Sequence, residues 1–123
     1  MADSMTNALK KALQTKLNAM IPSNFHRVKG TKPPLYAIFD FDTVTAEETV
    51  EQIELVVNVF GSGDITEPLD EKADEIWAAL NHWYFNDGTL VFTTYQETRG
   101  TVVDDTNNNN LHRRLVFDIR FYD

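Results

Sequence analysis

The chain has 123 residues, 42% of them apolar, and its length is typical of one domain, so we expect a single domain with a sizeable core over residues 1–123. It has no cysteine, which excludes disulfides, thiolate nucleophiles and cysteine-based zinc sites. Its net charge of -8 argues against nucleic-acid binding, which needs clustered Lys and Arg side chains. We expect the charge mainly to confer solubility. The alternative is an acidic face that repels DNA or contacts a basic partner.

The first expected element is a helix from about Ser4 to Met20. Lysines interrupt its apolar residues, which argues against a signal peptide, and no segment of the chain approaches the ~18 apolar residues of a membrane helix. Pro22 ends the helix. We expect it to dock on its own sheet or on a neighbouring subunit. Apolar residues at steps of three and four form its stripe: Met5, Leu9, Ala12, Leu13, Leu17 and Met20.

Two strands are expected next. The Pro- and Gly-containing stretch Pro22–Pro34 predicts a loop, and apolar alternation over Leu35–Asp42 predicts a strand. Thr43–Thr49 is expected to be a polar connection. Alternation resumes in Glu51–Phe60, a pattern typical of an antiparallel strand with one covered face. Gly61–Asp64 has the composition of a tight turn.

A second helix is expected from Thr66, a suitable N-cap, with Pro68 in its first turn. The sequence Asn86-Asp87-Gly88 is expected to end it. Its apolar stripe is the stronger of the two and comprises Leu69, Ala73, Ile76, Trp77, Leu80 and Tyr84.

Two more strands close the chain. The third strand begins at Leu90–Tyr95 and is expected to continue through Val103 with a kink at Gly100; a polar hairpin loop, Asp104–Asn110, leads to the last strand, Arg114–Tyr122. The sequence therefore predicts an α+β fold in the order α-β-β-α-β-β. We expect a mainly antiparallel four-stranded sheet with the helices packed on one face.

The sequence carries no catalytic signature. It has neither a nucleophile elbow nor a phosphate-binding glycine loop, and the histidines His26, His82 and His112 share no ligand spacing. We therefore assign no catalytic residue, no metal ligand and no cofactor. The densest acidic group is interpreted as a solvated strand end, with a divalent-metal site as the alternative; it comprises Asp40, Asp42, Glu47 and Glu48.

Three features are candidates for protein contacts. Aromatic residues near the end of the second helix suit either a subunit interface or a wrapped core. A small basic patch at the hairpin loop, formed by His112-Arg113-Arg114 with Arg99, suits either cross-strand pairing with Asp104 and Asp105 or contact with an acidic partner. The long Asn-rich hairpin suits a partner contact. The candidate interface residues are Trp83, Phe85, Arg99, Asn107, Asn108, Asn109, Asn110, His112 and Arg113.

The order of helices and strands is the most specific feature of the sequence. A helix and a Pro-rich loop lead into a strand at Pro33–Asp40; a second strand, Ile53–Phe60, ends in a polar turn; a helix packs back over Leu69–Tyr84; and closing strands end with Leu115–Phe121. In this order the chain resembles the tail-completion proteins of long-tailed bacteriophages, also called tail terminators. The similarity covers nearly the whole chain and is one of pattern.

The resemblance implies a non-catalytic structural protein of the virion, present in the host cytoplasm during assembly. It implies a homohexameric ring at the head–tail junction that caps the tail tube protein and offers a surface to the head connector. Phage DNA would pass through the lumen without specific binding, and no membrane is involved.

Two other functions remain open at this stage. One is a head-completion or minor capsid protein of the phage neck. The other is a small-molecule-binding or enzymatic α+β domain that uses the space between sheet and helices. The inward residues argue against the latter because they would line a dry core rather than a polar pocket: Leu35, Ala37, Phe39, Ile53, Leu55, Val57, Phe117 and Ile119.

Overall fold

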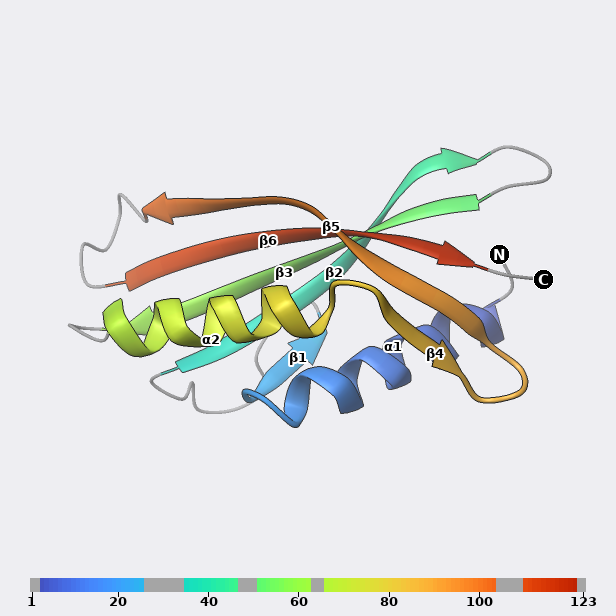
Figure 1. Ribbon diagram of the computed structural model, residues 1–123, viewed down its shortest axis with the longest axis horizontal. Helices are drawn as coiled ribbons and strands as arrows, with labels where there is room; N and C mark the ends of the chain where they lie inside the picture. Colours follow the sequence, from blue (N-terminus) through green and yellow to red (C-terminus); the bar gives the residue numbers. More distant parts are fainter. Residues whose placement is uncertain (1–2, 26–34, 47–50, 63–65, 104–109, 122–123) are drawn as a thin grey trace.

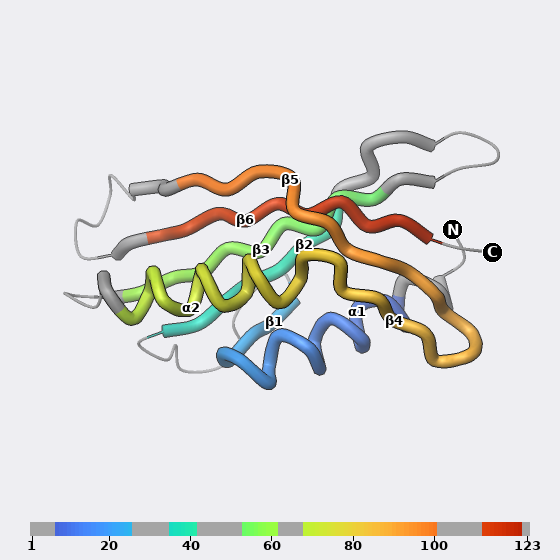
Figure 2. The backbone as a smooth tube through the Cα atoms, in the orientation of Figure 1, coloured from blue at the N-terminus to red at the C-terminus, as the bar shows by residue number. Residues whose placement is uncertain are grey.

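The computed structural model describes residues 3–25, 35–46, 51–62, 66–103 and 110–121 (Figure 1). Two helices lie against one strongly twisted sheet that curls into half a barrel (Figures 1 and 2). The strand order in space is β1-β2-β3-β6-β5-β4, and every neighbouring pair is antiparallel except β1 with β2. The strands are β1 (Ser23–Phe25), β2 (Leu35–Ala46), β3 (Glu51–Ser62), β4 (Trp83–Asn86), β5 (Val91–Val103) and β6 (Asn110–Phe121).

The α+β class is confirmed, but the prediction of a four-stranded sheet is wrong because the sheet has six strands and one parallel pair. The two missed strands are the shortest, with three residues in β1 and four in β4. Strand β1 lies within the stretch expected to be a loop, Pro22–Pro34, of which residues 26–34 lie outside the described part. So few residues show no alternation that a sequence pattern can detect.

Helix α1 (Asp3–Asn18) docks on its own chain, which decides between the two docking modes left open by the sequence. Leu9, Leu13 and Leu17 are fully buried in the core. The Asn18 side chain then accepts a hydrogen bond from the Ser23 backbone N–H at 2.8 Å, and the Gln14 amide donates to the Ser23 carbonyl. These two contacts place β1 beside α1, so the helix positions the parallel edge strand.

Helix α2 (Thr66–Ala79) ends earlier than predicted. A turn follows Ala79, and Trp83 to Asn86 form β4, so Asn86-Asp87-Gly88 is not a helix cap but the turn between β4 and β5. Gly88 has a φ of 91°, which only glycine adopts without strain. Tyr84 is 58% exposed and is not part of the helix stripe.

The core lies between the helices and one face of the sheet. The predicted inward residues of β3 are confirmed there, and so are those of β6. The predicted stripe of α2 is buried from Leu69 to Leu80, with Trp77 partly buried against the cluster. Residues buried in this core from β3, β6 and α2 are Ile53, Leu55, Val57, Val59, Leu115, Phe117, Ile119, Leu69, Ala73, Ile76 and Leu80.

Several strand boundaries differ from the predictions. Strand β2 continues to Ala46, so the connection predicted from Thr43 begins as strand, and its residues 47–50 lie outside the described part. Gly61 and Ser62 belong to β3, whereas residues 63–65 of the predicted turn are not described. In β5 the irregularity lies between Gln96 and Thr98 rather than at Gly100, and β5 changes direction midway along its length (Figure 2).

Candidate assembly surfaces

The face of the sheet opposite the helices carries its own side-chain rows. Val56 and Val116 pair across β3 and β6 and are buried, yet they lie outside the helix-facing core. Four residues further along β3, an aromatic row crosses three strands: Tyr36 stacks on Phe60 with ring centres 5.1 Å apart, and Phe60 stacks on His112 at 4.3 Å. Within the described residues no helix covers this row, so it forms part of an outward surface.

The aromatic row is fixed in place by hydrogen bonding and burial. Nε2 of His112 lies 2.6 Å from Oδ1 of Asn58, and this contact orients the imidazole against Phe60. Burial raises the pKa of the Tyr36 hydroxyl above its ordinary value. His112 is an interface candidate from the sequence as part of the basic patch, and the structure shows that its ring also stacks on Phe60.

A group of carboxylates lies further along the same face. Glu54 and Asp118 are register partners on β3 and β6, and the irregularity in β5 brings Glu97 to them. Although Glu97 is exposed, its pKa is raised by partial burial, by the Glu54 charge, by a hydrogen bond with Glu54 and by the Asp118 charge. Arg120 balances Asp118 through a 2.9 Å ion pair.

The carboxylates do not form a metal centre in the part of the chain that the structure describes, where no cluster of three or more His, Asp or Glu has suitable geometry. Of the four acidic residues considered as a metal site from the sequence, the Asp40 side chain is described, and its Oδ1 accepts a hydrogen bond from the Phe41 N–H at 3.1 Å. The side chains of Asp42, Glu47 and Glu48 lie outside the described set.

Two arginines of the predicted basic patch lie on the helix-facing side of the sheet, whereas His112 lies in the aromatic row on the other face. Arg113 bonds Asp70 of α2 through a 2.7 Å ion pair, and its side chain is only 13% exposed. Arg99 bonds Asp74, one helical turn further on, at 2.7 Å, with its guanidinium 5.4 Å from the Trp77 ring centre. Both arginines therefore tie α2 to the sheet, while the expected partners at positions 104 and 105 are not described.

The aromatic residues of β4 lie at the opposite end of the sheet. Trp83 and Phe85 pack against Phe92 with ring centres 5.3 and 5.1 Å away, so both contribute to the rim of the core. Lys16 of α1 lies over the Trp83 ring at 5.2 Å. Tyr84, between them, points to the other side of the strand and is the large apolar side chain most exposed among the described residues.

The remaining candidates are in the Asn-rich hairpin. Asn110 opens β6 and pairs with Ser62 of β3. Residues 107–109 lie outside the described part, so their proposed contact role is untested. The nine candidates thus do not form one site: the structure distributes the described ones among the helix–sheet contact, the outward aromatic row and the β4 rim.

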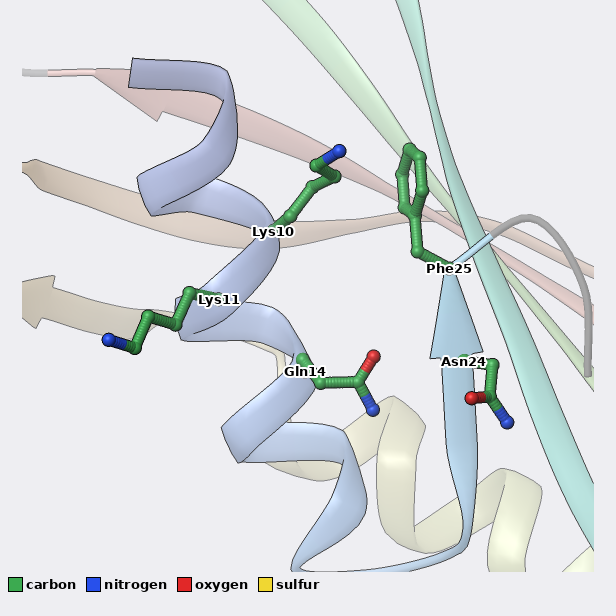
Figure 3. Close-up of a pocket in the computed structure, with 5 residues that line it drawn as sticks. All are labelled: Lys10, Lys11, Gln14, Asn24 and Phe25. Atoms are coloured by element: carbon green, nitrogen blue, oxygen red, sulfur yellow. The ribbon is translucent and has the colours of Figure 1, made fainter. Parts of the chain in front are cut away.

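An open pocket of about 320 Å³ lies between α1 and β1 (Figure 3). Lys10 reaches over the Phe25 ring at 4.7 Å, and Gln14 points toward β1, whereas Lys11 points away (Figure 3). Its lining of Lys10, Lys11, Gln14, Asn24 and Phe25 contains two surface lysines and two amides, a composition that carries no specific chemistry.

Two site features were missed in the sequence. By the alternation of β2 and β3, Tyr36 and Phe60 fall on the face opposite the buried one, but only strand pairing shows that they stack. The approach of Glu97 to Glu54 depends on the register shift in β5, which leaves no mark in the sequence pattern.

Among the described residues, no helix is long and apolar enough to cross a membrane. No family model matches the chain, and no curated protein matches it either. The fold itself has known counterparts among solved structures: it is an α+β fold with two helices on a curled, mixed sheet.

Two solved structures share this fold over essentially the whole chain. One, whose name states no function, has a TM-score of 0.71 at 17% identity and covers 100% of this chain and 97% of its own. The other comes from a structure described as the virion of a native gene transfer agent particle, with a TM-score of 0.71, 16% identity and 98% coverage of each chain. Structural similarity at such low sequence identity shows that the fold is shared.

Proposed function

We propose that this protein is a structural component of a phage-like virion and acts as a tail terminator. In this role it forms a ring, expected to be a hexamer, that caps the tail tube and joins it to the head. The observation that carries the proposal is the match over 98% of both chains to a component of a gene transfer agent virion. The order of elements in the sequence, which resembles tail-completion proteins, supports the same role independently of that match.

The chemistry of the described residues fits a non-catalytic role. Charged side chains near the helices bind one another, as Arg113 does with Asp70, rather than converging on an empty pocket. The space between helices and sheet is filled by fully buried apolar side chains such as Phe39, Phe92 and Phe117. Function then depends on surfaces that fit partners, and no cofactor is required.

The partners that we propose are other copies of the chain, the tail tube protein and the head connector. Phage DNA passes through the ring, and the net charge of -8 lets it slide by like-charge repulsion. The protein acts in the virion at the head–tail junction and is present in the host cytoplasm during assembly.

The proposed contacts within this assembly use the outward surfaces. The candidates for the subunit interface come from three regions. They are Trp83 and Phe85 at the β4 rim, His112 in the aromatic row, and Arg99 and Arg113 at the helix–sheet contact. The asparagines of the hairpin are candidates for contact with the tube or the connector: Asn107, Asn108, Asn109 and Asn110.

Electron microscopy of particles made without this protein tests the role. Overlong tails, or tails that do not join heads, are expected for a missing terminator. Finished heads that leak DNA would instead identify a head-completion protein, and normal particles would refute both roles.

The hairpin is tested separately by deleting Asn107 to Asn109. Folding should remain intact, as judged by an unchanged melting temperature, but ring formation or tail joining should be impaired. A matched control replaces the same residues with three serines, which keeps the loop length. If the shortened protein still terminates and joins tails normally, the loop is only a connector.

A further inference from the structure

We propose that the lysine side of α1 binds the acidic side of α2 in a second copy of this chain. The lysine side comprises Lys10 and Lys11, and the acidic side comprises Glu71 and Glu75. The contact itself rests on the charges of described side chains. That repeated contacts of this kind close into a ring rests on the proposed function.

The first observation is that charge is divided unevenly along the chain. Residues 1–34 hold six of the eleven Lys and Arg residues but one of the nineteen Asp and Glu residues. Their net charge is therefore +5, whereas the rest of the chain has a net charge of -13, and together these give the total of -8. A chain with two regions of opposite sign is electrostatically complementary to another copy of itself.

The second observation is that the lysines of α1 lack carboxylate partners. Among the described residues no ion pair joins Lys10, Lys11 or Lys16 to an acidic side chain, although acid is in excess in the chain. Lys10 lies over the Phe25 ring instead, and Lys11 is exposed. Residues 26–34, which are not described, contain no Asp or Glu that could neutralise these lysines.

The lysine side is broad rather than convergent. Lys10 reaches toward Phe25, whereas Lys11 points away from the pocket between α1 and β1 (Figure 3). A small ligand needs polar groups that converge on one point, but two divergent ammonium groups can each meet a different carboxylate on a protein surface. The arrangement therefore suits a second protein surface of opposite charge.

The third observation is that the exposed side of α2 carries this opposite charge. Glu71 and Glu75 are four residues apart on the helix, and Glu71 has no ion-pair partner in the described part of the chain. Like charges at this spacing destabilise a helix on its own. Lys72 binds Glu75 at 2.8 Å, but the Glu75 side chain remains 49% exposed, and such exposed pairs contribute little.

The positions of the two helices favour a second copy as the occupant. Both helices lie against the same face of the sheet, and α1 and α2 begin at opposite ends of the molecule (Figure 1). One copy can therefore offer α1 to the copy before it and α2 to the copy after it, which is a heterologous contact that repeats. DNA bound by the lysines would leave the acidic side of α2 unmatched.

Charge reversal tests the contact. Lys11→Glu and Glu71→Lys each place like charges at the proposed contact, so each variant alone should assemble at least about tenfold more weakly than the wild type. An equimolar mixture of the two variants should regain assembly, because alternating copies then join opposite charges at every contact. Arg114→Glu is the matched control: it changes the net charge as Lys11→Glu does, and Arg114 is exposed on the other face of the sheet.

Light scattering over a concentration series gives the first readout. We expect the wild type and Arg114→Glu to reach a multiple of the 14.1 kDa chain mass, and added salt to weaken this assembly because it screens exposed charges. The proposal is overturned by a wild type that is monomeric at every concentration, by equal weakening in Lys11→Glu and Arg114→Glu, or by a mixture that stays dissociated.

Cross-linking of the wild type gives a second readout that depends on no variant. A carbodiimide joins a lysine amine to a carboxylate through an amide bond and itself takes up the water that is lost. In a mixture of unlabelled and heavy-isotope-labelled copies, mass spectrometry should find α1 lysines joined to Glu71 or Glu75 of a differently labelled copy. Links between copies that all lie elsewhere, or links within one copy alone, overturn the proposal.

The two proposals fail in different ways. Normal particles made without this protein refute the virion role whatever the mixing experiment shows. Defective tails in that experiment, together with a folded Lys11→Glu variant that assembles as well as the wild type, leave the virion role standing and refute only the helix contact. A labelled DNA duplex that binds the wild type but not Lys11→Glu would assign the lysines to phosphates, and it too would refute the contact.

Discussion

His82 adopts a backbone φ of 59°, a left-handed conformation that residues with a Cβ rarely take. It lies in the turn between α2 and β4, and its ring meets Tyr95 edge-on with ring centres 5.0 Å apart. The turn that ends α2 and reverses the chain into β4 therefore depends on one strained residue held by an aromatic contact.

Two substitutions at His82 separate the effect of the backbone strain from the effect of the ring contact with Tyr95. His82→Gly and His82→Ala both remove the ring, but only Gly relieves the left-handed backbone. We expect the Gly variant to be more stable than the Ala variant by about 1 kcal/mol in urea unfolding. Equal stability of the two variants would show that the backbone at this position is not strained.

Glu97 gives a pH-dependent prediction. Its pKa is raised above the ordinary value of 4.5, first by burial and then by Glu54 and Asp118, so the folded protein binds this proton more tightly than the unfolded chain does. The stabilising contribution is therefore fully present below the ordinary value and is lost as the pH rises through the raised pKa. Glu97→Gln should raise the melting temperature at neutral pH and have a smaller effect in acid.

The measurement for Glu97 is a series of thermal melts from acidic to neutral pH. Glu71→Gln is the control because Glu71 is an exposed carboxylate on α2. A gain at neutral pH that is the same for both variants would reflect net charge alone, and would contradict a specific interaction with Glu54.

At the scale of elements, two side chains of β5 connect this strand to the C-terminal end of α2. Thr94 is fully buried, and its hydroxyl donates to the Leu80 carbonyl at 2.5 Å. Gln96 adds a bond from its amide to the Trp77 carbonyl at 3.0 Å. These two side chains donate hydrogen bonds to carbonyls at the C-terminal end of α2, where carbonyls lack partners within the helix. Strand β5 therefore caps the end of α2.

Thr94→Val keeps the size of the side chain and removes its hydroxyl. The Leu80 carbonyl then stays buried without that donor, so the free energy of unfolding should fall by about 1–3 kcal/mol. Urea unfolding measures this change, with Thr98→Val on the exposed part of β5 as the control. A loss no larger than that of the control would mean that water replaces the missing donor.

At the scale of the whole molecule, charge predicts how the protein treats DNA. Non-specific DNA binding is driven by the counterions that are released when Lys and Arg side chains neutralise DNA phosphates. A protein with an excess of eight negative charges is expected not to release them. We expect no binding of a labelled duplex at about 150 mM salt. A complex whose affinity falls steeply with added salt would contradict the proposal that DNA passes through without sticking.

The longer a helix or strand is, the more accurately the sequence predicts its position and its buried face. Helix α1 and strand β3 have enough turns or alternations to define their buried faces, and the core residues predicted for β3 are confirmed. The end of α2 was placed too late because Trp83 and Tyr84 continue its apolar residues into β4. A four-residue strand cannot be separated from a helix end by periodicity alone.

The candidate surfaces show the same division. Arg99 and Arg113 were identified from their charge. The sequence could not show that both bind α2, because their partners Asp74 and Asp70 lie far from them along the chain. Their role in a subunit interface stays a prediction. The hairpin strands β5 and β6 were expected to be neighbours, and the structure pairs them from Val103 with Leu111 onward.

The sequence by itself determined the α+β class, the buried faces of the long elements and the acidic character of the molecule, because periodicity and composition are local properties. Only the tertiary structure decided that β1 and β4 join the described sheet as its edge strands and that Tyr36 and Phe60 stack on its outward face. Strand pairing joins residues far apart in the chain, and its register depends on the energy of the whole fold rather than on any one segment.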